Sequence, residues 1–114
     1  MADSDCVFCK ILAGEVPADV VTSSETGVAF RDLNPQAPTH VLVIPRAHYE
    51  NVAAMAADDP AGLAGVYKLA ADVAEHEGLS SYRMVTNTGP DAGQSVFHLH
   101  VHVLGGRSLS WPPG

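Results

Sequence analysis

A chain of 114 residues, 46% of them hydrophobic and 17% charged, has the size and composition of one globular domain and not of a disordered segment. Its formal net charge of −7 opposes binding to a nucleic acid or to an anionic membrane face, but local backbone amides and histidines can still hold a small phosphate ligand. No apolar run approaches the roughly 20 residues that cross a bilayer. The acidic start lacks the pattern of a signal peptide, so we expect a cytoplasmic protein.

The first half of the chain predicts one short helix followed by three strands. Residues 6–13 carry apolar side chains at helical spacing, and Gly14 follows as a C-terminal stop. Residues 32–38 are expected to form a loop, because Pro35 and Pro38 both interrupt strand pairing. The three strands are expected at residues 20–22, 28–30 and 40–44.

The second half predicts the longest helix and two more strands. Asp59 fits an N-cap with Pro60 at the first helical position, and an apolar stripe continues until Gly78 ends the helix. Because the strands are joined mostly by polar turns, we expect an α+β fold: a five-stranded antiparallel sheet with two helices on one face. It would be a single domain over residues 1–114, with residues 1–5 as a loose end. The helix is expected over 60–77, the strands over 83–86 and 96–104, and a glycine-rich loop over 87–95.

Three histidines alternate with apolar residues near the C-terminus, as His98, His100 and His102. Because successive side chains of a strand point to opposite faces, these three would share one face at a spacing of roughly 6–7 Å, while Leu99 and Val101 pack the other. A strand face that merely meets solvent more often mixes threonine, lysine and glutamate. The pattern therefore favours a chemical site, either for a metal ion or for phosphoryl transfer.

The loop directly before these histidines contains Gly93, Gln94 and Ser95. Glycine allows a positive φ there, which leaves backbone N–H groups free to face an anion. On its own this tripeptide would be explained as an ordinary turn. Its place before the histidine row predicts a set of donors for a phosphate group.

Residues 98–104 match the signature of the histidine triad (HIT) family of nucleotide hydrolases and transferases, in which three histidines alternate with apolar residues. The chain resembles in particular the histidine triad nucleotide-binding branch, through residues 32–44, 93–102 and 111–114. Members of that branch are nucleoside phosphoramidases that act as homodimers. The resemblance implies a HIT-like fold with its sheet extended across a dimer, and a purine nucleoside monophosphate or phosphoramidate as ligand.

The resemblance also implies a role for each matching residue. His100 would be the nucleophile that attacks the α-phosphorus and forms a nucleotidyl-histidine intermediate, with no catalytic metal required. His40 and His98 would orient it, and Asp32 would accept hydrogen bonds from the ribose hydroxyls. The residues that would hold the phosphate or contact the departing group are Asn87, Gly93, Gln94, Ser95, Val96 and His102. Those around the base would be Val7, Phe8, Ile11, Val16, Phe30 and Leu33, for which core packing is an equal explanation.

Both cysteines lie in one short motif, Cys6-x-x-Cys9. By itself this spacing fits half of a metal site, a redox pair or two buried thiols. Several HIT proteins bind zinc through two cysteines, a histidine after a Val-Ile-Pro strand end and the first histidine of the triad. The resemblance thus implies a structural zinc site formed by Cys6, Cys9, His48 and His98.

Three functions are compatible with these residues. The first is a hydrolase of nucleoside monophosphoryl groups, a phosphoramidase or alternatively a dinucleoside polyphosphate hydrolase. The second is a nucleotide-binding regulatory module with little turnover, although a pure binder does not need a nucleophile such as His100. The third is a zinc hydrolase in which His98, His100 and His102 hold an activated water. We expect the phosphoramidase, with neither nucleic acid nor a membrane as partner.

Overall fold

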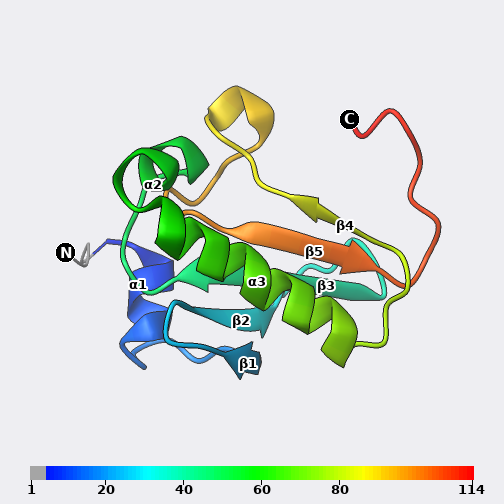
Figure 1. Cartoon of the computed structure of the whole chain (residues 1–114), viewed down its shortest axis with the longest axis horizontal. Helices are drawn as coiled ribbons and strands as arrows, with labels where there is room; N and C mark the ends of the chain where they lie inside the picture. Colours follow the sequence, from blue (N-terminus) through cyan, green and yellow to red (C-terminus); the bar gives the residue numbers. More distant parts are fainter. Residues whose placement is uncertain (1–4) are drawn as a thin grey trace.

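Five antiparallel strands form one sheet in the order β1-β2-β3-β5-β4 in the computed structural model, which describes residues 5–114 (Figure 1). The expected α+β class and five-stranded antiparallel sheet are confirmed. β5 inserts between β3 and β4, so only the first three strands follow one another across the sheet. Of the expected loose end over residues 1–5, all but Asp5 lies outside the described residues. The strands are β1 (Val20–Ser23), β2 (Gly27–Arg31), β3 (Thr39–Pro45), β4 (Tyr82–Val85) and β5 (Val101–Gly105).

Helix α3 (Pro60–His76) covers one face of the sheet and builds the larger core. Its start agrees with the sequence, because the Asp59 side chain caps the helix by accepting from the Gly62 N–H at 2.9 Å. Every second residue of a strand points to this face, and those residues pack against one apolar stripe of the helix. The contacting side chains include Ala29, Val41, Val43, Val101 and Val103 from the sheet and Val66, Leu69, Ala70 and Val73 from α3.

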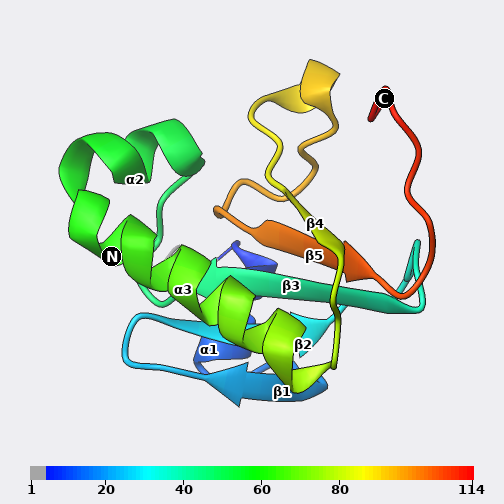
Figure 2. The ribbon, with the colours of Figure 1, turned by 45° about the vertical axis from the view of Figure 1, so that its right-hand side comes forward.

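Helix α1 (Val7–Leu12) lies on the opposite face, behind the sheet in Figure 2, and not on the same face as α3 as expected. The alternation of the strands explains this placement. The apolar side chains of β2 and β3 that point away from α3 need a cover of their own, and Phe8 and Cys9 of α1 supply it. The strand residues covered in this way are Val28, Phe30, Leu42 and Ile44.

A third α-helix, α2 (Val52–Asp58), is present among residues 5–114, where two helices were expected. The Asn51 side chain caps it by accepting from the Ala54 N–H at 2.9 Å. Alanine-rich sequence favours a helix, but Met55 alone of its residues is buried, so no apolar stripe identified α2 in the sequence. Within the described part of the chain, no helix has the length and apolar character needed to cross a membrane.

The predicted strand over residues 96–104 is wrong at its start, because β5 begins only at Val101. The pairing of β5 with β3 starts at Val101, opposite Val43. Upstream of this pair the Leu99 N–H donates to the carbonyl of a loop residue, Tyr49, at 2.7 Å. Leu99 still packs on the α3 side, so the side chains continue to alternate through the irregular segment. The histidine row therefore keeps its common side, although two of its members precede the strand.

Candidate functional site

A cavity of about 330 Å³ lies between α1 and the face of the sheet opposite α3. Its lining is mostly apolar with a few polar groups, which is typical of sites for small ligands. All six apolar residues predicted around a base contribute to it: Val7, Phe8, Ile11, Val16, Phe30 and Leu33. The predicted polar and phosphate-side residues that line it are Asp32, Ser95, Val96, His100 and His102.

The imidazole of His100 is fixed by a hydrogen bond to the main chain. Its Nδ1 lies 2.8 Å from the carbonyl oxygen of His98, and since a carbonyl only accepts, Nδ1 carries the proton. The Nε2 atom of the neutral ring therefore keeps its lone pair. Phe8 packs edge-on against this ring, with the centroids 5.1 Å apart. His100 thus holds one tautomer, in which a nucleophilic nitrogen is available at the cavity.

His40 and His102 form a hydrogen-bonded pair across neighbouring strands. Leu42 is the direct partner of His102 in the β3–β5 register, so His40 meets His102 on the diagonal, with Nε2 2.8 Å from Nδ1. The Gln36 N–H donates to Nδ1 of His40 at 3.0 Å, so the neutral His40 ring carries its proton on Nε2 and donates it to His102. A neutral His102 then carries its own proton on Nε2 and can donate from there.

Burial keeps this pair neutral near neutral pH. The pKa of His102 is lowered from 6.5 to about 4, first by burial and then by the charges that His100 and His40 would carry when protonated. Burial also lowers the pKa of His40, although the Asp32 carboxylate, 3.4 Å from its Nε2, acts in the opposite direction. The hydrogen bonds from the Gln36 N–H to His40 and from His40 to His102 require these neutral forms, because each Nδ1 atom accepts.

Three of the predicted phosphate contacts, Asn87, Gly93 and Gln94, do not line the cavity. The buried Gln94 side chain instead braces its own loop: it accepts from the Gly89 N–H at 2.9 Å and donates to the Glu50 carbonyl at 2.7 Å. Gly93 has a φ of +99°, a conformation that favours glycine. These residues shape the loop that brings Ser95 to the cavity.

The cavity also contains residues that the sequence analysis did not single out. Leu42 on β3 is one of them, and it pairs with Phe30 on one side and with His102 on the other. Its position two residues after His40 was the available signal, because residues two apart on a strand share a face. The others are Pro17, Ala18, Asp19 and Arg31.

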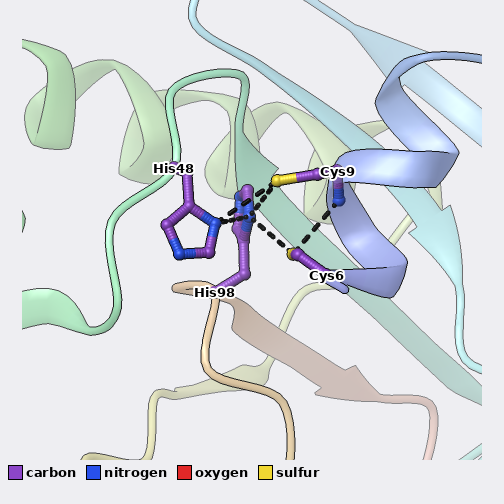
Figure 3. Close-up of side chains that lie close together, drawn as sticks. All are labelled: Cys6, Cys9, His48 and His98. Atoms are coloured by element: carbon purple, nitrogen blue, oxygen red, sulfur yellow. Dashed lines mark hydrogen bonds between the residues drawn. The ribbon is translucent and has the colours of Figure 1, made fainter. Parts of the chain in front are cut away.

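A second cluster joins α1 to two histidines from distant parts of the chain (Figure 3). Cys6 caps α1 and Cys9 lies in its first turn, while His48 follows β3 and His98 precedes β5. Nδ1 of His98 lies 3.4 Å from the Cys6 sulfur, 3.5 Å from the Cys9 sulfur and 3.1 Å from Nδ1 of His48. The Cys9 sulfur lies 3.3 Å from the same His48 atom. The structure thus brings together all four residues predicted as metal ligands.

These four side chains fit a tetrahedral zinc ion. With bonds of roughly 2.3 Å to sulfur and 2.0–2.1 Å to nitrogen, a nitrogen ligand lies roughly 3.3–3.6 Å from its neighbours, close to the spacing here. Nε2 of His98 donates to the Pro45 carbonyl at 3.0 Å, so its Nδ1 has a free lone pair directed at the cluster. Burial lowers the pKa of His98 to about 4 and raises the pKa of the Cys6 thiol. A bound cation would reverse the second effect by displacing the thiol proton.

Another group of possible ligands, Asp32, His40 and His102, is close enough to share an ion. The hydrogen bonds indicate a different use, because the Gln36 N–H places the proton of His40 on Nε2, which then has no lone pair to give. Among the described residues, neither group of possible ligands includes His100. A zinc hydrolase with all three histidines of the row around one ion does not fit this geometry.

Comparison with known proteins gives consistent matches over nearly the whole chain. The sequence profile of the HIT domain matches residues 13–109. A HIT-like protein of Synechococcus elongatus, described as uncharacterized, is 49% identical over 111 residues, which cover 96% of this chain and 97% of that protein. A 14 kDa zinc-binding protein of Zea mays is 46% identical over 116 residues, covering 98% and 90% respectively. The crystal structure of a HIT family hydrolase from Legionella pneumophila superposes with a TM-score of 0.92 at 47% identity, covering 96% of this chain and 100% of that one.

Proposed function

This chain belongs to the HIT family, and from that membership we propose that it hydrolyses purine nucleoside phosphoramidates through a nucleotidyl intermediate on His100. The observation that carries the proposal is the hydrogen bond from Nδ1 of His100 to the His98 carbonyl. It selects the tautomer whose Nε2 can attack phosphorus, on a residue that lines a cavity of about 330 Å³. The Legionella relative is described as a hydrolase, which supports the same class of reaction.

The nucleoside would bind between α1 and the sheet. Phe8, Phe30 and Leu42 offer apolar surface for a base, and such a slot accepts either adenine or guanine. One oxygen of Asp32 accepts from the Asn34 N–H at 2.8 Å, which orients the carboxylate at the cavity. The remaining acceptor positions of this carboxylate would receive hydrogen bonds from the ribose hydroxyls.

The reaction would proceed by two displacements at the α-phosphorus. Nε2 of His100 forms a bond to phosphorus while the P–N bond to the leaving amine breaks, and the departing nitrogen takes a proton from solvent water, relayed by the hydroxyl of the exposed Ser95. Water then cleaves the nucleotidyl-histidine, which releases a nucleoside monophosphate and restores His100. His102 donates from Nε2 to the phosphoryl oxygens throughout, since its pair with His40 keeps the proton there.

The test is to trap the intermediate. Quenched-flow mass spectrometry with adenosine phosphoramidate should show an early mass increase of one nucleotidyl group on the peptide that contains His100. His100→Ala should lose the adduct and at least about 10³-fold in kcat, while its affinity for adenosine monophosphate stays within roughly tenfold.

His76→Ala is the matched control, because His76 is exposed on α3 and distant in sequence from the cavity residues. It should retain the adduct and full turnover. An adduct on another residue, or near-normal turnover of His100→Ala, would contradict the histidine-nucleophile mechanism. Nucleotide binding without turnover on a panel of phosphoramidates and dinucleoside polyphosphates would favour the regulatory module instead.

We propose in addition that Cys6, Cys9, His48 and His98 hold a structural zinc ion. The tetrahedral spacing of the four ligand atoms supports this, and so does the name of the maize relative, a zinc-binding protein. When bound, zinc would act as a cross-link between α1 and the two histidine segments. Nothing in the proposed displacements at phosphorus requires it.

A further inference from the structure

His98 uses three different atoms for three different contacts. Its Nδ1 faces the two cysteine sulfurs and His48, and its Nε2 donates to the carbonyl of Pro45. Its own carbonyl oxygen accepts from Nδ1 of His100 at 2.8 Å. The side chain that completes the metal cluster and the backbone atom that sets the His100 tautomer therefore belong to one residue. A shift of His98 changes both sites together.

Helix α1 makes a second connection between the cluster and the cavity. Phe8 lies between the two cysteines in sequence, and its ring packs edge-on against both His98, at 6.0 Å, and His100, at 5.1 Å. Phe8 and its neighbour Val7 also line the cavity. A helix of six residues is far shorter than the roughly 12–15 that isolated helices need, so its position depends on such tertiary anchors.

We propose that metal binding at Cys6, Cys9, His48 and His98 is thermodynamically coupled to nucleotide binding in the cavity. The cation fixes α1, which forms one wall of the cavity, and it fixes His98, which positions His100. His98 is in this sense a positioning residue. The proposal rests on the nucleotide function above, and it makes the metal cluster a control point of the catalytic site as well as a cross-link.

Coupling between two binding sites is reciprocal, which gives a test that does not depend on turnover. Zinc affinity of the full chain is measured by competition with a chelator, with and without saturating adenosine monophosphate. The affinity for adenosine monophosphate is measured by calorimetry on zinc-loaded and zinc-free protein, both shown to be folded by circular dichroism. We expect each ligand to tighten the other by the same factor, about fivefold or more.

His48→Ala is the diagnostic variant, because His48 is a ligand of the cluster that does not line the cavity at His100. It should weaken zinc binding and, through the loss of metal, reduce nucleotide affinity to the value of the zinc-free wild type. His76→Ala, which removes an exposed histidine on α3, should leave both affinities unchanged. If His48→Ala does not fold, the reciprocal titration of the wild type still decides the matter.

The tautomer of the His100 ring can be measured directly, and it distinguishes coupling between the two sites from a general loosening of the fold. Nitrogen-15 NMR of the His100 ring should show a single tautomer protonated at Nδ1 in the zinc-loaded protein, and a mixture without zinc. The kcat of the zinc-free protein should fall in addition to the change in KM.

Equal nucleotide affinities with and without zinc, or zinc affinity that ignores the nucleotide, would overturn the coupling while leaving the proposed hydrolase intact. Failure of zinc-loaded protein to bind adenosine monophosphate at all would overturn the nucleotide function, and the coupling with it.

Discussion

Main-chain groups set the proton positions of three histidines in this molecule. The Gln36 N–H holds Nδ1 of His40, while carbonyl oxygens hold Nδ1 of His100 and Nε2 of His98. Backbone groups do not titrate, so each tautomer depends on how the chain holds the ring against its backbone partner. Each neutral ring is left with one nitrogen for one use: a hydrogen bond to the next histidine, a lone pair at the cavity, or a lone pair facing the cysteines.

The lowered pKa of His102 predicts a loss of stability in acid. Between pH 6.5 and about 4 the His102 ring is protonated in the unfolded chain and neutral in the folded chain. The free energy of unfolding therefore falls as the pH falls through this window. This loss of stability is absent above pH 6.5, where the His102 ring is neutral in both the folded and the unfolded chain. Urea unfolding from pH 7.5 to 4.5 should show this dependence, and it should be weaker in His102→Gln.

His76→Gln provides the comparison for that experiment, because it removes an exposed histidine from α3 instead of a buried one. Its unfolding free energy should follow the wild-type dependence on pH. A His102→Gln protein with the full wild-type pH dependence would show that this ring does not resist protonation in the folded state.

At the scale of the elements, helix α3 depends on its N-cap. The Asp59 carboxylate accepts from the Gly62 N–H at 2.9 Å, and Asp59→Ala should lower the free energy of unfolding by about 1 kcal/mol. Asp72→Ala is the matched control: it removes the same charge from the same helix, where Asp72 only meets Lys68 on the surface. Its effect should stay below about 0.5 kcal/mol. Equal losses in the two variants would mean that charge, and not capping, is responsible.

The elements with strong local signals were predictable, and those that depend on distant partners were not. Asp59, Pro60 and the apolar stripe located α3 within one residue at each end. Helix α2 escaped notice because it buries only Met55 and so shows no apolar stripe, although Asn51 is a favourable N-cap. The late start of β5 is set by where its pairing with β3 begins, and the residues before β5 give no sign of that.

The same division applies to the candidate site. The Cys-x-x-Cys spacing alone left several uses open, and the resemblance to the HIT family predicted the full ligand set; the structure places Cys6, Cys9, His48 and His98 together. Gln94 was predicted to contact a phosphate through the backbone amides of its loop, and that remains a prediction; its side chain has a use that was not predicted, because it braces the loop. The hydrogen bond to the Glu50 carbonyl joins residues far apart in sequence, so no local pattern indicates it.

At the scale of the whole molecule, the resemblance to the HIT family predicts a dimer, and an exposed edge of the sheet is available for it. β4 is one of the two edge strands, Tyr82 at its start is 42% exposed, and Trp111 of the tail is 81% exposed beside Arg83. We propose a twofold contact through β4 and α3 that continues the sheet into a second copy and covers this edge. Light scattering at micromolar concentration should give the mass of a homodimer.

Tyr82→Lys should weaken that dimer at least about tenfold, because it places a charge at the proposed contact. Val20→Lys is the matched variant on the opposite edge strand, β1, where the side chain is 52% exposed, and it should leave the dimer unchanged. A monomeric wild-type protein, or equal effects of the two lysines, would rule out this interface.

The expected cytoplasmic location remains a prediction.

The acceptor that fixes His100 is a backbone oxygen, that of residue 98. Any amino-acid substitution at that position deletes the imidazole and keeps the oxygen in the chain. A saturation scan of the gene will therefore measure how much the side chain matters and will not register the atom that sets the tautomer of His100. Mutational tolerance and chemical importance become separate quantities at position 98, and a mild phenotype there would be evidence only about the side chain.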